Sequence, residues 1–255
     1  AIKNLGDGTV KILSGTVKTF GKYVIAGQGT IIIGNEDDEV GAGPDVNGII
    51  EVSADVYVHS GQITSKETAI SSDKNITITG GTITGGKYGV STTSGTLTIG
   101  NNDDTVSTTA PSITGPVGGI KVGDNATLDF YDGIITGPTD NSIEGNVTNT
   151  PNGYNVQKTN DGTNQTAILV SSNYVEYNGD TIIKYYSTLQ EAFTGAVSGN
   201  TIKPLKDLTD ESTADIELAE GKNVILDLNG FKILTAQRIE NSGTLEIKDS
   251  VGNGI

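Results

Sequence analysis

The sequence lacks cysteine, tryptophan and methionine altogether, and aromatic residues make up only 5% of its 255 positions. Without cysteine, neither a disulfide nor a thiolate metal site can form. With so few large side chains, any core has to be narrow and built from aliphatic residues. The chain also lacks an apolar run of membrane-spanning length, so we expect no membrane insertion.

Basic residues are scarce as well. Lys and Arg number 16 against 31 Asp and Glu, which gives a formal net charge of −15. A surface this acidic repels the phosphates of nucleic acids and of anionic lipids. We therefore expect no nucleic-acid partner, and we expect an extracellular protein, either secreted or held at a cell surface.

Repetition is the strongest signal in the sequence. Residues 75–106 repeat residues 8–40, and Gly81 follows its counterpart Gly15 by 66 residues. Within the first copy, two Gly-Thr elements begin 21 residues apart, and aliphatic and polar residues alternate after each. A period near twenty, filled with short alternating strands and glycine turns, is typical of one coil of a β-solenoid.

This pattern predicts an all-β chain folded as a right-handed parallel β-helix. A single coil is too small to bury its own apolar face, so it must stack on its neighbours. Alternate residues such as Ile76 and Ile78 would then point inward and stack on their equivalents in the next coil. An antiparallel sandwich or hairpin array is the alternative, but repeats with loops of unequal length favour the solenoid.

The repeat also predicts the domain organisation. Residues 1–145 form a β-helix body with an internal duplication of residues 8–64 and 75–137. The Asn- and Thr-rich residues 146–174 form a connector, or a small β cap over the final coil. Residues 175–255 begin a second β-helix module, which continues into residue 1 of a neighbouring subunit or repeat.

One short capping helix is expected near residues 187–197. Ser187 is the predicted N-cap, Gln190 stands at the third helical position, and apolar residues follow at helical spacing. The residues of this predicted module start are Ser187, Leu189, Gln190, Ala192 and Phe193.

The same segment carries a resemblance to a known family. Thr188-Leu-Gln-Glu-Ala-Phe, then Gly199-Asn-Thr-Ile-Lys, then Lys222-Asn-Val-Ile-Leu-Asp-Leu-Asn-Gly resembles the start of pectin-lyase-like right-handed β-helices. The resemblance implies that the helix plugs the first coil. With GTLEIKDS and GTLTIG, the chain is also similar to repeat modules of large adhesin-like surface proteins of Gram-positive bacteria. That similarity implies a structural or adhesive extracellular module, a rod or fibre building block on a bacterial surface.

The two ends of the chain look like consecutive coils. Ile239-Glu-Asn-Ser-Gly-Thr-Leu-Glu-Ile resembles Ile2-Lys-Asn-Leu-Gly-Asp-Gly-Thr-Val-Lys-Ile. We therefore expect the partner to be the chain itself, stacked head to tail, or an adjacent repeat of the same protein. A cut through two different modules is the alternative. The predicted end-to-end interface consists of Ile2, Val10, Ile12, Leu245 and Ile247.

Pectin-lyase-like folds also host polysaccharide lyases and glycosidases, which the resemblance brings into consideration. Such enzymes use acidic calcium ligands with a basic residue, or separated Asp, Gly-His-Gly and Arg-x-Lys motifs. Here Arg238 is the sole arginine, His59 is the sole histidine, and Gly-His-Gly is absent. We predict that the protein is not an enzyme and name no catalytic residue; a divergent polysaccharide lyase is the alternative.

Two acidic turns offer the oxygen ligands that calcium prefers. The candidate ligands are Asn35, Asp37, Asp38, Asn101, Asp103 and Asp104. Their spacing matches neither an EF-hand nor the glycine-rich nonapeptide repeat. Solvated turns that keep the solenoid edges from aggregating are the alternative, and no cofactor other than calcium is expected.

Several tyrosines raise the further alternative of a carbohydrate-binding surface domain, whose partners would be host glycans or proteins. The candidates for a sugar-stacking face are Tyr23, Tyr88, Tyr131, Tyr185 and Tyr186. Because tryptophan is absent, we predict instead that these side chains pack against the solenoid.

Overall fold

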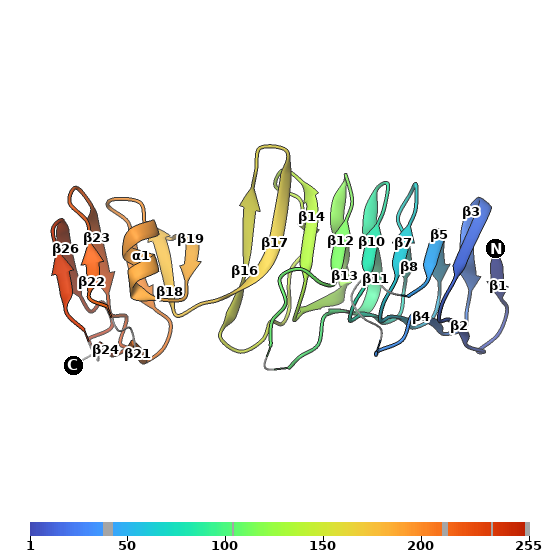
Figure 1. The fold of residues 1–255 in the computed structure, drawn as a ribbon, viewed down its shortest axis with the longest axis horizontal. Helices are drawn as coiled ribbons and strands as arrows, with labels where there is room; N and C mark the ends of the chain where they lie inside the picture. The colour runs from blue at the N-terminus through green and yellow to red at the C-terminus, as the bar shows by residue number, and fades with distance from the viewer. Residues whose placement is uncertain (38–42, 104, 211–213, 236, 253–255) are drawn as a thin grey trace. The chain divides into compact units, whose positions relative to one another are not determined.

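The structure is a computed structural model that describes residues 1–37, 43–103, 105–210, 214–235 and 237–252. The described contacts divide the chain into two units. The N-terminal unit comprises Ala1–Pro151 and Lys158–Leu169, and the C-terminal unit comprises Asn152–Gln157 and Val170–Ile255. Each is a stack of short strands (Figure 1), which confirms the predicted all-β parallel β-helix with one short helix.

The coils of the N-terminal unit wind over three parallel sheets, here called faces I, II and III. Face I contains β2 (Val10–Ile12), β4 (Ile31–Ile33), β6 (Val56–Val58), β9 (Ile76–Ile78) and the last parts of β11 (Tyr88–Ile99) and β13 (Gly118–Phe130). Face II contains the starts of β3 (Thr16–Gly27) and β5 (Asp45–Val52), then β7 (Gln62–Thr64), β10 (Thr82–Thr84), β12 (Ser112–Thr114) and β14 (Ile134–Pro138). Face III contains β1 (Ile2–Asn4), the ends of β3 and β5, β8 (Ile70–Ser72), the first parts of β11 and β13, and β15 (Ile143–Glu144).

This winding explains the repeat in the sequence. Val10 and Ile76, which the duplication aligns, both lie on face I and begin equivalent strands three coils apart. Between them the ladder runs through Ile31 and Val56 in parallel register. The period of about twenty residues is therefore the length of chain that passes once over all three faces.

The core of the N-terminal unit consists of stacked aliphatic columns. On face I, Ile31, Val56, Ile76, Leu97 and Leu128 follow one another in register, and each is fully buried. Side chains between the inward positions point to solvent, because successive residues of a strand face opposite sides. Burying one such aliphatic side chain contributes about 1.5–3 kcal/mol, so the column supplies much of the stability.

One end of the N-terminal unit is closed by an antiparallel strand. β17 (Asn164–Ser171), which follows β16 (Tyr154–Asn160), pairs antiparallel with β14. The Gln165 side chain accepts hydrogen bonds from the Ser142 backbone N–H (3.0 Å) and hydroxyl (2.7 Å). At the other end, β1 and β2 pair only with β3 and β4 among the described residues. That end of the stack is open.

The C-terminal unit begins with an antiparallel hairpin and continues as a second parallel stack. β18 (Tyr174–Asn178) pairs antiparallel with β19 (Thr181–Tyr186) on one side and with β20 (Thr201–Pro204) on the other. Parallel pairs then join β20 to β23 (Asn223–Asp227) and β26 (Thr244–Lys248), β21 (Leu208–Asp210) to β24 (Ile233–Thr235), and β22 (Ile216–Leu218) to β25 (Ile239–Asn241).

The helix α1 (Leu189–Gly195) is the predicted one, but its cap lies one residue later than expected. Thr188 has an extended backbone, and its hydroxyl accepts the backbone N–H of Glu191 at 3.1 Å. The Ser187 hydroxyl instead donates to the Ser171 carbonyl oxygen at 2.9 Å, so Ser187 is not the N-cap. The Glu191 carboxylate in turn accepts the Ser187 N–H, a displaced form of the capping box.

The helix covers the first coil of the C-terminal unit. Leu189, Ala192 and Phe193 are buried in its hydrophobic core. Gln190 was predicted as a capping-box residue, but its side-chain amide bonds β22 instead: its oxygen accepts the Glu217 N–H at 2.6 Å and its nitrogen donates to the Glu217 carbonyl oxygen at 3.1 Å. These are the two bonds that a neighbouring strand would make, so the glutamine satisfies the strand edge.

Among the described residues of the C-terminal unit, the carboxylates of Glu176 and Asp227 are buried. Glu176 accepts hydrogen bonds from the Tyr186 hydroxyl (2.6 Å), the Val197 N–H (2.8 Å) and the Asn200 amide (2.7 Å). Asp227, only 2% exposed, accepts the N–H groups of Ser250 and Asn229. Burial by itself raises the pKa of Asp227, but these hydrogen bonds and one from Lys203 outweigh it and lower the pKa to about 2.

Removing an aliphatic side chain from the stacked column should destabilise the N-terminal unit. Ile78 is fully buried on face I, so Ile78→Ala should cost about 2–5 kcal/mol of unfolding free energy. The neighbouring Thr77 points outward on the same strand, and Thr77→Ala should change that free energy by no more than about 0.5 kcal/mol. Urea unfolding followed by circular dichroism measures both; equal losses would contradict the inward and outward assignment.

The low pKa of Asp227 predicts an acid-dependent stability. Because the folded-state pKa lies below the ordinary value of 3.8, the ionised carboxylate stabilises the fold above about pH 4. That contribution, about 2 kcal/mol, should disappear as the pH falls towards 2. Asp227→Asn should therefore be less stable than the parent at pH 7 and nearly equal to it at pH 2. Asp180→Asn, in an exposed turn, is the control and should follow the parent at both pH values.

Candidate functional site

A polar groove of about 450 Å³ lies on the N-terminal unit at the corner between faces I and II. Two consecutive coils turn this corner in only three residues each. Residues 59–61 join Val58 of face I to Gln62 of face II, and residues 79–81 join Ile78 to Thr82. The coils on either side turn it with long connections, residues 34–44 and 100–111. The short corners form the floor of the groove, with Glu36 on one side and Asn101, Thr109 and Ala110 on the other.

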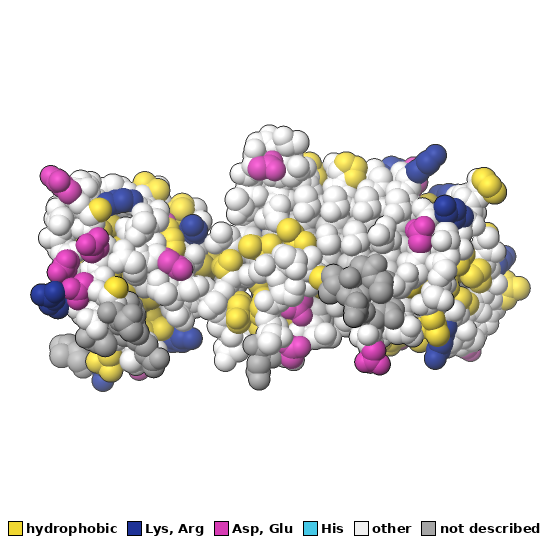
Figure 2. Space-filling view, viewed as in Figure 1, with side chains coloured by type: hydrophobic (Ala, Val, Ile, Leu, Met, Phe, Trp, Pro, Cys, Tyr) yellow, Lys and Arg dark blue, Asp and Glu magenta, His cyan; other side chains and the backbone are white. Residues whose placement is uncertain are grey.

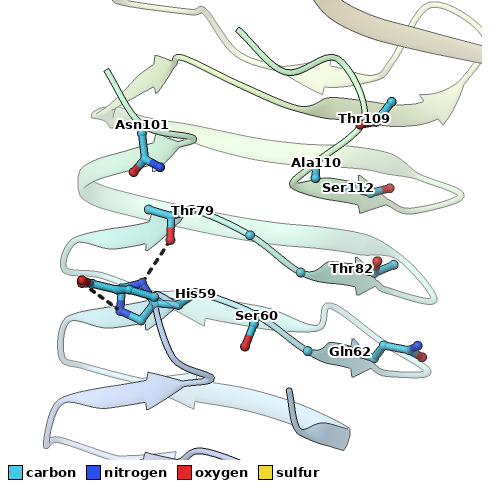
Figure 3. A pocket seen from close by; sticks show the side chains of 13 residues that line it. His59, Ser60, Gln62, Thr79, Thr82, Asn101, Thr109, Ala110 and Ser112 are labelled. Atoms are coloured by element: carbon cyan, nitrogen blue, oxygen red, sulfur yellow. Dashed lines mark hydrogen bonds and ion pairs between the residues drawn. The ribbon is translucent and has the colours of Figure 1, made fainter. Parts of the chain in front are cut away.

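Two rows of small polar side chains line the floor (Figure 3). His59, Thr79 and Asn101 follow the ends of face I strands on successive coils, and Gln62, Thr82 and Ser112 begin the face II strands opposite them. Gly81 stands between the rows with a φ of 85°, and a Cβ there would lie 2.8 Å from the Gly61 carbonyl oxygen. Glycine at this corner therefore lets the two coils approach closely.

The His59 side chain has three contacts in the groove. Its Nδ1 and the Thr79 hydroxyl share a hydrogen bond of 3.0 Å, and its Nε2 lies 3.9 Å from a Glu36 carboxylate oxygen. Its ring also stacks on Tyr57, with 6.4 Å between the centroids and 15° between the planes. These contacts hold the imidazole in place as part of the groove wall.

The groove can hydrogen-bond a ligand, and His59 and Glu36 are the titratable side chains among its described lining residues. Among its described lining residues, Glu36 is the one carboxylate, and the rest are mainly hydroxyl, amide and glycine groups. Paired carboxylates about 5–10 Å apart are what glycoside hydrolysis ordinarily requires. The described lining therefore suits recognition of a hydroxyl-rich molecule better than cleavage of one.

The predicted calcium ligands are only partly described. Asp38 and Asp104 lie outside the described residues, whereas Asn35, Asp37, Asn101 and Asp103 lie within them. Asp103 accepts the N–H and the hydroxyl of Thr105, both at 2.8 Å, and these bonds lower its pKa. In the described part of the chain, no three His, Cys, Asp or Glu side chains are placed to hold a metal ion.

A buried carboxylate that the sequence analysis did not select holds the second acidic turn. Asp132, 8% exposed, accepts the N–H of Asn101 at 2.9 Å and that of Ser107 at 2.6 Å. Burial raises the pKa of Asp132, while these two bonds oppose the rise. Its carboxylate therefore fixes both ends of the turn and sets one wall of the groove.

Arg238, the basic residue considered for a lyase, lies in the C-terminal unit and does not line the groove. Its guanidinium is 2.7 Å from Asp215 and 3.4 Å from Glu240, and its side chain is 79% exposed. It thus has two carboxylate neighbours, which the sequence did not predict. The hydrogen bond to Asp215 raises the pKa of Arg238, whereas a general base needs a lowered one.

None of the five tyrosines considered for a sugar-stacking face lines this groove. The hydroxyl of Tyr88 bonds the Glu144 carboxylate, which also pairs with Lys121 at 2.7 Å. Tyr186 is buried and bonds Glu176. The aromatic ring beside the groove is that of Tyr57, which the sequence did not single out.

The residues predicted for the end-to-end interface lie at the two open ends. Ile2 and Val10 are half-buried and Ile12 is buried, each in a strand of the first coil. Leu245 is half-buried, and Ile247 is 56% exposed, although both belong to the inward-facing positions of β26. Inward-facing positions become exposed only where the next coil is missing, so these strands form uncovered ends among the described residues.

Comparison of the chain with protein-family models, with curated proteins and with solved structures found no match. Of the described helices, none has the length and apolar character needed to cross a membrane. The candidate sites are therefore defined by geometry: one lateral groove and two open ends. One feature of the sequence could have indicated the groove residues Ser60, Thr79 and Thr82. Two corners of three residues lie between corners with much longer loops.

Proposed function

We propose that this chain is a structural β-helical module that builds a rod or fibre by end-to-end stacking. The supporting observation is that each unit is closed at one end and open at the other. β17 closes one end of the N-terminal unit, and α1 with the β18–β19 hairpin closes one end of the C-terminal unit. The N-terminal unit is therefore open at its first coil, and the C-terminal unit is open at its last coil. The last coil of one copy can thus stack on the first coil of another.

Exposed apolar side chains occur in the coils at these open ends. In the first coil, Leu5 is 76% exposed and Phe20 is fully exposed; in the last coil, Leu234, Ile247 and Val251 are each more than half exposed. Ile247 takes an inward position of β26, so burying it under a further coil would stabilise the assembly by the hydrophobic effect. Unpaired strand edges beside exposed apolar groups are the template on which another strand adds.

The setting we propose for this module is the outside of a bacterial cell, on the surface or secreted. The strongly acidic composition and the resemblance to adhesin-like repeat modules support it. An adhesive role would follow from repetition, because many stacked copies present the same lateral surface many times. The role we propose is non-enzymatic, since stacking and repetition need no catalytic residue.

End-to-end stacking predicts concentration-dependent linear assembly of the purified chain. Sedimentation velocity should show species that grow with concentration, and electron microscopy should show linear particles. Aligned samples should diffract at about 4.8 Å along the particle axis, because strands of successive coils stack at that spacing. A chain that stays monomeric at every concentration would overturn the proposal.

The contact can be tested with one substitution at an open end and one elsewhere. Ile247→Asp places a charge in the inward column of the last coil and should abolish assembly. Val117→Asp changes a side chain of similar exposure, 44%, at a corner of the N-terminal unit, and should assemble like the parent. Circular dichroism should show that both variants keep the parent fold.

A second candidate function is binding of a hydroxyl-rich ligand, such as a host glycan, in the groove beside His59. The observation that favours it is the double row of hydroxyl and amide side chains on the groove floor. Such groups can exchange hydrogen bonds with sugar hydroxyls, and the imidazole adds a planar wall. This function is compatible with stacking, because the groove opens at the side of the coils.

Filling the groove should weaken that binding. Thr82→Tyr places a ring in the groove, whereas Thr84→Tyr makes the same change on the same strand outside it. A glycan array with the parent chain selects a ligand, and calorimetry then measures its dissociation constant. Thr82→Tyr should raise the constant at least about tenfold and Thr84→Tyr should leave it unchanged. Equal effects, or no glycan bound by the parent, would overturn the second candidate.

A further inference from the structure

We infer that consecutive copies of this chain meet in one fixed register, with β25 and β26 of one copy against β1 and β2 of the next. Two charge pairs across the contact, Glu240 with Lys3 and Glu246 with Lys11, set that register. The inference rests on the proposed end-to-end stacking and adds to it which strands meet and which side chains select them.

The apolar positions of the two ends match in this register. On β25, Ile239 continues the inward column above Ile216, and Ile2 on β1 begins the inward column that Ile25 continues. Leu245 and Ile247 on β26 lie above buried Val224 and Leu226, while Val10 and Ile12 lie below buried Ile31 and Ile33. Stacking therefore places isoleucine on isoleucine and leucine on valine, as inside each unit.

The outward positions then carry opposite charges. Glu240 lies between Ile239 and Asn241, and Lys3 lies between Ile2 and Asn4, so the pair shares one rung. Glu246 and Lys11 share the equivalent rung of β26 and β2. All four charged side chains are exposed. Shifting the contact by one residue would turn the charges inward and the aliphatic residues outward.

Oppositely charged side chains already join consecutive coils inside the N-terminal unit. Lys87 lies 2.6 Å from Glu67 on the preceding coil, and Lys121 lies 2.7 Å from Glu144 on the following one. In the C-terminal unit, Glu240 follows Glu217 on the same ladder, and Arg238 lies 3.4 Å from Glu240. A lysine from the next copy would end this run of like charges.

The longer turn of the first coil does not prevent the stacking. Asn241 and Leu245 are joined by a short turn, whereas Asn4 and Val10 are joined by a turn two residues longer. Inside the N-terminal unit, β13 has one residue more than β11 at the same corner, and the two strands still pair on both sides of it. An extra residue at this corner therefore does not break the ladder.

The first coil is basic in a chain that is acidic overall. Residues 1–27 contain four lysines and one acidic residue, although the whole chain has a net charge of −15. The last coil, residues 229–252, contains three basic and three acidic residues, and two of the acidic ones, Glu240 and Glu246, take outward positions of β25 and β26. Figure 2 shows Lys and hydrophobic side chains together at the β1–β3 end, and side chains of both charges at the end that carries β22 and β26. Attraction between the lysines of one copy and these two glutamates of another would speed association.

Charge reversal with complementation tests this register. The variants Lys3→Glu/Lys11→Glu and Glu240→Lys/Glu246→Lys each place like charges across the contact. Each alone should raise the dissociation constant of assembly, measured by sedimentation, at least about tenfold. Mixed in equal amounts, they should assemble with a constant close to that of the parent, because every contact between unlike variants again joins Glu with Lys.

A control variant separates this effect from a change in net charge. Lys66→Glu/Lys74→Glu reverses two exposed lysines on middle coils and should assemble like the parent. The deficit of each end variant should shrink in about 1 M salt, where the screening length is about 3 Å. Assembly of each end variant as strong as that of the parent, or a mixture that assembles no better than its components, would overturn the register while leaving end-to-end stacking intact. A parent chain that never assembles would overturn both.

Discussion

The parallel stacking of one coil on the next is the interaction on which the rest of this structure depends. A coil of about twenty residues contributes only short strands, and all of their ladder hydrogen bonds go to neighbouring coils. Its aliphatic side chains are buried only because equivalent side chains lie above and below them. Each end of a stack must therefore be closed by a different element or covered by another coil. β17 and α1 are such closing elements, and the Gln190 amide makes with Glu217 the two hydrogen bonds that a neighbouring strand would make.

The lateral groove follows from the same constraint. Coils can vary in length only at their corners, because an insertion inside a strand would break the ladder. The two long connections at the corner between faces I and II lie on either side of two coils with short corners, and a hollow results between them. Asp132 fixes the second long connection by bonding Asn101 and Ser107. Glu36 and Asn101, which belong to the two acidic turns of the repeat, thus lie on either side of the groove.

Stacking also gives the outward side chains a defined neighbour. A charge on one coil faces the equivalent position of the next, so its sign decides whether the two coils attract each other. Glu67 with Lys87 and Lys121 with Glu144 are favourable pairs inside the N-terminal unit. The outward lysines of the first coil and the outward glutamates of β25 and β26 would pair in the same way at the ends. In a narrow aliphatic core, each coil presents a similar apolar surface to the next. Charge at the rim is then a means by which the register of a contact can be selected.

The sequence by itself determined the solenoid, its period, and the existence of the helix near residue 189, because spacing between glycines and alternating aliphatics is a local property of the chain. It placed the helix cap one residue early, since Ser187 and Thr188 are both capping residues and only the contact of Ser187 with Ser171 decides between them. It did not reveal the groove, Asp132 as the residue that fixes its wall, or the neighbours of Arg238. Those features join residues from different coils, and only the lengths of the corners and the register of stacking bring them together.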